Sequence, residues 1–458
     1  MSGYEVTVPD MMRAREARFQ VQCALRAQYP GAAVVCLTMN VAGPVKTTPE
    51  IERAFDWGVR AVRAALGGFA LCFEAQVRER TGPEAAFAVR GDARELKRRL
   101  CQLEDGCDLG RLLDIDVIAP EGEKLARTEL GLPQRRCLLC GEAAPVCARS
   151  RAHTVDALFA RTHEIIRTHF DELFAQRIAQ QAQRALLCEV AVTPKPGLVD
   201  RANAGAHCDM DIFTFIDSAF ALRDYFETCA RTGLAHRGGD AQACFDALRV
   251  PGLLAEAAMR EATCGVNTHK GAIFSLGICC AALGMGGEGG STEEALVRCG
   301  GMTRARMEQE LARIAQGEAA TFGETLYQRR RVGGVRAEAA SGFPAVQEAG
   351  LPRLRAALAA GLSLNDAALC ALVALMSRTQ DTNAVRRGGE EAAERLRRDA
   401  AALDGDITAA LAACVLAERM PQLREQLAQW DDALSAQGIS PGGCADLLAL
   451  TLLVHFMA

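Results

Sequence analysis

In the first 170 residues, segments whose hydrophobic positions have the spacing of a strand alternate with segments that have the spacing of a helix. Residues 32–40 are a short apolar run, typical of a buried strand, whereas Ile51, Phe55 and Val59 recur at helical spacing and Gly67 ends their helix. The whole pattern predicts strand 32–40, helix 51–66, strand 69–77, strand 85–90, helix 92–104 and strand 113–117. This β-α-β-β-α-β order predicts an α+β fold with helices on one face of a sheet.

From about residue 175 the spacing of hydrophobic residues changes from a mixture of strand and helix patterns to helix patterns alone. Windows rich in Ala, Leu, Arg and Glu follow one another to the end of the chain, and no segment has a convincing strand pattern. We therefore predict a multidomain protein with an α+β domain at 1–172 and an all-α domain at 173–458. The boundary between them is a soft one, because residues 155–174 already have a helical pattern.

Composition and charge exclude several classes of protein. The chain has 458 residues, half of them apolar, and a net charge of −5. Residues 1–170 carry 24 basic and 22 acidic side chains and the remainder 28 and 35, so neither part is basic enough for a nucleic-acid partner. The odd number of cysteines, 19, indicates reduced thiols, and no signal peptide is predicted. The most apolar stretches, 271–287 and 447–457, are too short to span a membrane, so we expect buried helices and a cytoplasmic protein.

Two carboxylates in the first domain have the spacing of a metal site. Asp114 and Asp116 are two residues apart in the predicted strand 113–117, so they lie on one face of it. Such a pair can hold a divalent ion that neutralises a polyphosphate, although two solvated acids on a strand face have the same spacing. After strand 32–40, Lys46 and nearby backbone amides can contact a phosphate, and the alternative is an ordinary loop.

A second cluster in this domain combines thiols with an imidazole. Cys137, Cys140, Cys147 and His153 follow one another at short intervals, which is the ligand set of a closed, structural zinc site. In a chain with 19 cysteines the same spacing can also arise by chance.

Four segments of the first domain carry a resemblance to a known family. They are Gly-Pro-Val-Lys at 43–46, Thr-Gly-Pro-Glu at 81–84, Gly-Arg-Leu-Leu-Asp-Ile-Asp-Val at 110–117 and Pro-Gln-Arg-Arg-Cys-Leu-Leu-Cys at 133–140. Together they resemble the apo-citrate lyase phosphoribosyl-dephospho-CoA transferases over most of residues 20–165. The resemblance implies a nucleotidyltransferase-like fold, in which a serine of the citrate lyase acyl carrier (gamma) subunit attacks triphosphoribosyl-dephospho-CoA and pyrophosphate leaves. It also implies that Mg²⁺ is bound by the catalytic Asp114 and Asp116, and phosphates by Lys46, Arg111, Arg135 and Arg136.

The second domain contains charged clusters between glycines and prolines. The segment 189–211 is so dense in mixed charge that a solvated loop explains it poorly. In 265–272, His269 and Lys270 precede an apolar helix, whose N-terminal amides can bind a phosphate. Arg378 and Asp381 lie one helical turn apart, which an ordinary ion pair at a helix end would also explain.

These clusters resemble a second family. The matching segments are Thr-Pro-Lys-Pro-Gly-Leu-Val-Asp-Arg at 193–201, His207, Asp-Met-Asp at 209–211 and Asn-Thr-His-Lys-Gly at 267–271. They resemble the triphosphoribosyl-dephospho-CoA synthases over about 180–455. The resemblance implies that the ribosyl C1′ of ATP passes to a hydroxyl of 3′-dephospho-CoA, with release of adenine and retention of the triphosphate.

This chemistry sets the residues that the site needs. Cleavage of an N-glycosidic bond develops positive charge that a carboxylate stabilises, the incoming hydroxyl needs a base, and the triphosphate needs Mg²⁺ and cations. We assign Asp209, Asp211 and Asp381 to catalysis as metal ligands or base, with Mg²⁺ on Asp209 and Asp211. Substrate and phosphate contacts are expected from Lys195, Arg201, Asn203, His207, Asn267, His269, Lys270, Arg378 and Arg387.

Together the resemblances predict a bifunctional transferase that makes and attaches the prosthetic group of citrate lyase. One alternative is the equivalent maturation of malonate decarboxylase, against which the segment 133–140 argues. Another is a non-catalytic regulator that binds zinc and a nucleotide, which would leave the acidic segment 209–211 unexplained. The predicted small-molecule partners are ATP and dephospho-CoA, with no nucleic acid and no membrane.

Overall fold

The structure, a computed structural model, describes residues 4–316 and 334–458 of the chain. Its contacts divide into two compact units, Met1–Phe170 and Asp171–Ala458. The division falls within one long helix, α5 (Val155–Ala191). The protein is therefore multidomain, as the change of hydrophobic period predicts.

The first unit contains a four-stranded antiparallel sheet with strand order β2-β3-β1-β4. The predicted β-α-β-β-α-β order is confirmed, and one further helix precedes it. The elements are α1 (Val8–Gln28), β1 (Ala33–Met39), α2 (Pro49–Ala65), β2 (Ala70–Glu79), β3 (Gly82–Arg90), α3 (Ala93–Asp105), the 3-10 turn η1 (Gly110–Leu112), β4 (Leu113–Ile118), the 3-10 turn η2 (Arg127–Leu130) and α4 (Ala144–Ser150).

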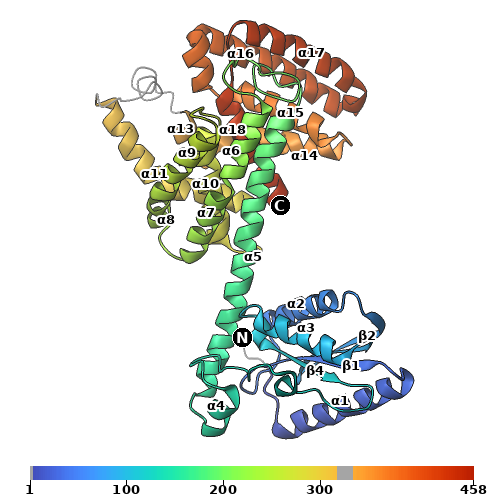
Figure 1. The fold of residues 1–458 in the computed structure, drawn as a ribbon. Helices are drawn as coiled ribbons and strands as arrows, with labels where there is room; N and C mark the ends of the chain where they lie inside the picture. The colour runs from blue at the N-terminus through green and yellow to red at the C-terminus, as the bar shows by residue number, and fades with distance from the viewer. Residues whose placement is uncertain (1–3, 317–333) are drawn as a thin grey trace. The chain divides into compact units, whose positions relative to one another are not determined.

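Different helices cover the two faces of this sheet (Figure 1). On one face, Val35 and Leu37 of β1 pack with Phe55 of α2 and with apolar residues of α3. On the other face, Val34 packs with Leu25 of α1. The prediction that helices cover only one face is therefore wrong. Leu25 is the one residue of α1 that is buried, so this helix lacks the apolar stripe by which an amphipathic helix is recognised in a sequence.

The described residues of the second unit form helices joined by loops, with no strand among them, which confirms the predicted all-α architecture. After α5 it contains α6 (Ile212–Ala221), α7 (Arg223–Ala235), α8 (Ala241–Ala247), α9 (Arg249–Ala262), α10 (Lys270–Gly286), α11 (Thr292–Ala315), α13 (Gly334–Ala340), the π-helical turn η3 (Val346–Gly350), α14 (Leu351–Ala359), α15 (Leu364–Arg378), α16 (Thr382–Ala412), α17 (Leu416–Ala436) and α18 (Gly442–Met457).

Helices α10, α15 and α18 lie at the centre of this unit. Most of their residues are buried, and α18 contacts both α10 and α15. A helix that is apolar on all sides belongs inside a core, so the apolar stretches 271–287 and 447–457 are buried helices, as predicted. None of the helices in the described part of the chain has the length and apolarity that a membrane crossing requires.

Candidate active sites

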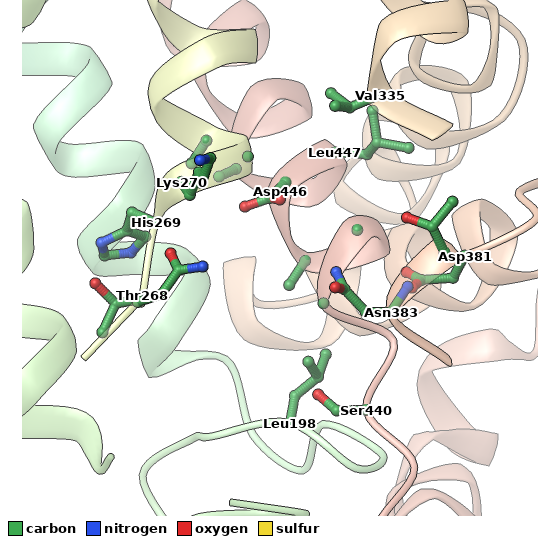
Figure 2. A pocket seen from close by; sticks show the side chains of 18 of the residues that line it. Leu198, Thr268, His269, Lys270, Val335, Asp381, Asn383, Ser440, Asp446 and Leu447 are labelled. Carbon is green, nitrogen blue, oxygen red and sulfur yellow. The ribbon is translucent and has the colours of Figure 1, made fainter. Parts of the chain in front are cut away.

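A cavity of about 410 Å³ lies in the second unit where several helices begin. Residues at the N-termini of α10, α16 and α18 line it, together with part of the loop that follows α5 (Figure 2). Helix N-termini present free backbone N–H groups and the positive end of the helix dipole. The cavity is therefore suited to a ligand with negative charge.

The structure brings most of the predicted synthase residues to this cavity. Those that line it are Lys195, His207, Asp209, Asn267, His269, Lys270, Asp381 and Arg387. Those that the structure does not place in its lining are Arg201, Asn203, Asp211 and Arg378. The loop residues of the second group have other partners: Arg201 donates to Asn365 Oδ1 (3.0 Å), Asn203 donates to Asp431 Oδ2 (2.8 Å), and Asp211 caps α6 by accepting from the Thr214 amide (2.9 Å).

A buried ion pair supports one wall of the cavity. Lys195 is 1% exposed, and its ammonium contacts the carboxylate of Glu189 on α5. Burial raises the pKa of Glu189, and the Lys195 charge opposes that effect. The loop is held by Asp200, which accepts from the Lys195 amide (2.9 Å). Lys195 thus neutralises a carboxylate in the protein.

His269 has one ring nitrogen engaged and the other free for a ligand. Thr268 Oγ1 donates to Ser218 Oγ (2.8 Å), and Ser218 Oγ lies 2.7 Å from His269 Nδ1. Burial lowers the pKa of His269 to about 3, so the imidazole is neutral at physiological pH. Among the described residues, His269 Nδ1 is the acceptor for the Ser218 hydroxyl, so we assign the ring proton to Nε2. Within residues 4–316 and 334–458, Nε2 has no hydrogen-bond partner although it is buried, and a buried donor of this kind needs an acceptor from a ligand or an ordered water.

Asp381 uses its carboxylate to join two helices. Oδ1 accepts from the amides of Asn383 (2.8 Å) and Ala384 (3.0 Å) as the N-cap of α16, and Oδ2 accepts from the Cys444 amide (2.8 Å) on α18. Burial raises the pKa of Asp381, while these amides lower it. Three hydrogen bonds from backbone amides favour a role for the Asp381 carboxylate in positioning α16 and α18 over a role as metal ligand or base.

Asp446 is a cavity residue that the sequence analysis missed. It lies on α18 between the start of α10 and the start of α16 (Figure 2). Burial raises the pKa of Asp446 well above its ordinary value, and the nearby Glu189 and Asp381 raise it further. The sequence signal for Asp446 was a single acid in an otherwise apolar helix, which begins directly after Pro441.

The mouth of the cavity carries the exposed charges. Arg387 donates to His207 Nδ1 (3.0 Å), and His207 Nε2 lies 3.0 Å from Ser440 Oγ. Arg386 lines the same region, and the side chain of Asp209 is 59% exposed. Cations and a carboxylate therefore meet where solvent enters.

In the first unit, Asp114 and Asp116 lie on one face of the sheet, as predicted. The register of β1 and β4 pairs Thr38 with Asp114 and Cys36 with Asp116. Both side chains reach solvent, and each has a cation near it: Arg135 lies 3.5 Å from Asp114, and Lys124 lies 2.7 Å from Asp116.

A cavity of about 530 Å³ in this unit is lined by basic side chains. They are Arg111, Arg135, Arg136 and Arg151. Arg135 is fixed by Glu104 (3.3 Å), a buried acid that also accepts from the Ile115 amide (2.9 Å). The cavity therefore combines fixed positive charge with proximity, through Arg135, to Asp114.

Lys46 is placed differently from the other predicted phosphate ligands. Its ammonium donates to the Val41 carbonyl (2.6 Å), it is outside the lining of the basic cavity, and burial lowers its pKa. Its interaction with the chain's own backbone explains why the loop needs a lysine without invoking a phosphate.

The predicted thiol and imidazole cluster is formed in space. One ligand atom from each of Cys137, Cys140, Cys147 and His153 lies within 4.8 Å of every other. Cys140 Sγ is 3.3 Å from Cys147 Sγ and 3.2 Å from His153 Nε2. A tetrahedral zinc ion with Zn–S bonds of about 2.3 Å fits ligand atoms at such separations. The Cys137 carbonyl also accepts from Arg111 (2.9 Å), which links the cluster to the basic cavity.

Comparison with known proteins matches each unit to a family. Residues 6–169 match the apo-citrate lyase phosphoribosyl-dephospho-CoA transferases, and residues 175–458 match the ATP:dephospho-CoA triphosphoribosyl transferases. Relatives named Protein CitXG align with nearly the whole chain: that of Leuconostoc mesenteroides subsp. cremoris is 31% identical over 98% of this chain and 97% of its own length, and that of Haemophilus influenzae is 33% identical over 98% and 96%. A probable 2-(5''-triphosphoribosyl)-3'-dephosphocoenzyme-A synthase of Pectobacterium carotovorum is 40% identical over 65% of this chain and 95% of its own length. The chain therefore belongs to the family in which these two transferases are fused, and it is a bifunctional enzyme of citrate lyase prosthetic-group biosynthesis.

Proposed function

We propose that the two cavities are the two active sites, with synthase chemistry in residues 173–458 and transferase chemistry in residues 1–172. The observation that carries the first assignment is the unpartnered Nε2 of His269 in a cavity where α10, α16 and α18 begin. ATP and 3′-dephospho-CoA meet there, adenine leaves, and the triphosphoribosyl product passes to the other site. A serine of the citrate lyase acyl carrier (gamma) subunit then accepts the phosphoribosyl-dephospho-CoA group, and pyrophosphate is released.

In the synthase site, the triphosphate lies at the mouth of the cavity. Arg387 and Lys270 bind its oxygens, and Asn267 and His269 contact the rest of the nucleotide. Asp209 fits Mg²⁺ because it offers exposed carboxylate oxygens, the ligands that this ion prefers. Asp211, the second proposed ligand, lies two residues later and uses Oδ1 to cap α6. When bound, Mg²⁺ would neutralise the phosphates.

In the transferase site, Asp114 and Asp116 would hold Mg²⁺, since both carboxylates reach solvent on one face of β4. Arg111, Arg135 and Arg136 neutralise the charge of the leaving pyrophosphate. A nucleotidyltransferase-like mechanism of this kind requires positioning and electrostatics rather than a covalent enzyme intermediate.

The cysteine cluster would hold a structural zinc ion with Cys137, Cys140, Cys147 and His153 as ligands. A set of four protein ligands leaves no open position, so the ion supplies folding energy rather than chemistry. All 19 cysteines are free thiols, which supports a reducing, cytoplasmic setting for both reactions.

The assignment is tested by incubating the full chain with ATP, dephospho-CoA, Mg²⁺ and the apo acyl carrier subunit. Free adenine reports the first step, and the mass of the carrier reports the second. Asp209→Asn is expected to abolish adenine release, whereas Asp217→Asn, an exposed acid on α6 away from the cavity, retains it. Wild-type turnover by Asp209→Asn and Asp211→Asn would remove the proposed metal site.

A further inference from the structure

Four carboxyl groups with little exposure line the synthase cavity, the buried Glu189 and Asp381 and the half-buried Glu338 and Asp446, and the protein compensates them unequally. Glu189 contacts the ammonium of Lys195, and Asp381 accepts from three backbone amides. Asp446 accepts from the Ala272 amide and has no cation within salt-bridge distance in the described part of the chain. Glu338 accepts from the Ala345 amide (3.2 Å) and likewise has no cation within that distance among the described residues. Asp446 and Glu338 are therefore the cavity carboxyl groups whose charged forms the protein stabilises least, and Asp446 is the one that contacts the start of α10 at Gly271.

The distribution of charge fixes how a nucleotide can enter. Arg386, Arg387 and Lys270 line the cavity with exposed charge, and Lys270 also pairs with Glu256 (3.0 Å). Asp446 lies between Lys270 and the apolar Leu447 (Figure 2). The exposed cations attract the triphosphate, so it stays with them. The neutral, flat base is the part of ATP that can be buried against Asp446.

The geometry points to Asp446 as the general acid that protonates the departing adenine. In this step the C1′–N9 bond breaks and its electron pair goes to the adenine ring, while the Asp446 proton passes to a ring nitrogen and adenine leaves as a neutral tautomer. The hydroxyl oxygen of dephospho-CoA forms the new bond to C1′. The proton that this hydroxyl loses is released to solvent, and Asp446 is reprotonated before the next turnover. This inference rests on the proposed placement of the synthase site in this cavity.

The surroundings of Asp446 agree with this role. Burial, and then the charges of Glu189 and Asp381, raise the pKa of Asp446, which favours its protonated form. The other titratable groups around it in the cavity include Lys195, His269, Lys270 and Glu338; Lys195 is paired with Glu189, and Lys270 with Glu256. His269 is neutral and keeps its Nε2 proton, so it can donate a hydrogen bond to the substrate without competing as an acid.

The test uses two leaving groups. Adenine needs protonation to leave, whereas 4-nitrophenolate does not, so 4-nitrophenyl ribofuranoside 5-triphosphate reports the same ribosyl transfer without the acid. In the full chain, Asp446→Asn is expected to lower adenine release from ATP by about 10²- to 10⁴-fold. Release of nitrophenolate with dephospho-CoA as acceptor is expected to stay within about threefold of wild type.

Equal losses with the two substrates would show that Asp446 only supports the structure, and unchanged turnover of ATP would show that it has no part in the step. Asp209→Asn separates this result from the placement of the site, because a variant that cannot hold the triphosphate loses both substrates alike. If Asp446→Asn does not fold, the wild-type pH profile decides instead. Adenine release is expected to fall at high pH while nitrophenolate release does not, and parallel profiles would overturn the inference.

Discussion

The carboxylate of Asp446 occupies the space that a side chain on Gly271 would need, because an ideal Cβ on Gly271 would lie 1.9 Å from Asp446 Oδ2. These residues belong to α18 and α10, which pack together at the cavity. A side chain at position 271 would therefore have to displace the half-buried carboxyl group of Asp446. Gly271 positions Asp446 at the first turn of α10, where the Ala272 amide holds it.

Gly271→Ala is expected to displace Asp446 and to lower adenine release by at least tenfold. Overpacking of a buried site should also cost about 1–3 kcal/mol in the free energy of unfolding. Both values are read from steady-state kinetics and urea unfolding of the full chain. Gly405→Ala in α16 is the control, because nothing lies within 4 Å of a Cβ there. The close-approach argument fails if the two variants have the same adenine release.

His269 predicts a dependence of stability on pH. Its pKa in the folded protein is about 3, against an ordinary value of 6.5, so the unfolded chain binds the extra proton between these values. The free energy of unfolding therefore falls as pH drops below 6.5, by about 2 kcal/mol from this group alone at pH 5. His269→Asn should remove that part of the slope, and His236→Asn should not.

The measurement can be confined to the second unit, because the chain has two tryptophans, Trp57 in the first unit and Trp430 in α17. Urea unfolding is followed through Trp430 in a Trp57→Phe background at pH 5 and pH 7.5. If His269→Asn and its parent lose the same stability between these pH values, the imidazole is not held neutral in the folded state.

The sequence predicts those parts of the fold that follow from the spacing of hydrophobic residues along the chain. Alternation along β4 places Asp114 and Asp116 on one face, and continuous apolarity identifies α10 and α18 as buried. It does not predict α1, whose single buried residue, Leu25, leaves no stripe to detect. A helix that is attached to a sheet by so few residues is visible only in the tertiary structure.

The site shows the same limit for individual side chains. His269 and Lys270 were recognised because their own segment contains turn residues before an apolar helix. Asp446 was missed because its meaning depends on Gly271, a residue distant in the sequence and adjacent in space. Lys46 has the residue type of a phosphate ligand, yet its ammonium donates to the Val41 carbonyl.

Asp114→Asn tests the transferase site with an internal control. The variant should lose transfer to the carrier by at least 10²-fold, because one of the two carboxylates proposed to hold Mg²⁺ is gone. Adenine release from ATP should be unchanged, since that reaction belongs to the second unit. Glu121→Gln, an exposed acid in the turn after β4, should leave both activities intact. Transfer at the wild-type rate by Asp114→Asn would place the metal elsewhere.

Removal of the proposed zinc ion should impair the transferase and spare the synthase. The Cys137 carbonyl accepts from Arg111, and Arg111 and Arg136 line the basic cavity. Arg136 belongs to the loop that carries Cys137, so loss of the metal would release Arg111 from this loop and would free Arg136 together with the loop.

Cys140→Ser removes a ligand that contacts both Cys147 and His153, and Cys23→Ser, an exposed thiol in α1, is the matched control. We expect one zinc per chain by elemental analysis in wild type and in Cys23→Ser, and none in Cys140→Ser. Transfer to the carrier should fall by more than tenfold in Cys140→Ser with adenine release unchanged. A zinc-free wild-type protein with full transferase activity would refute the site, and zinc loss without loss of transfer would refute its link to Arg111.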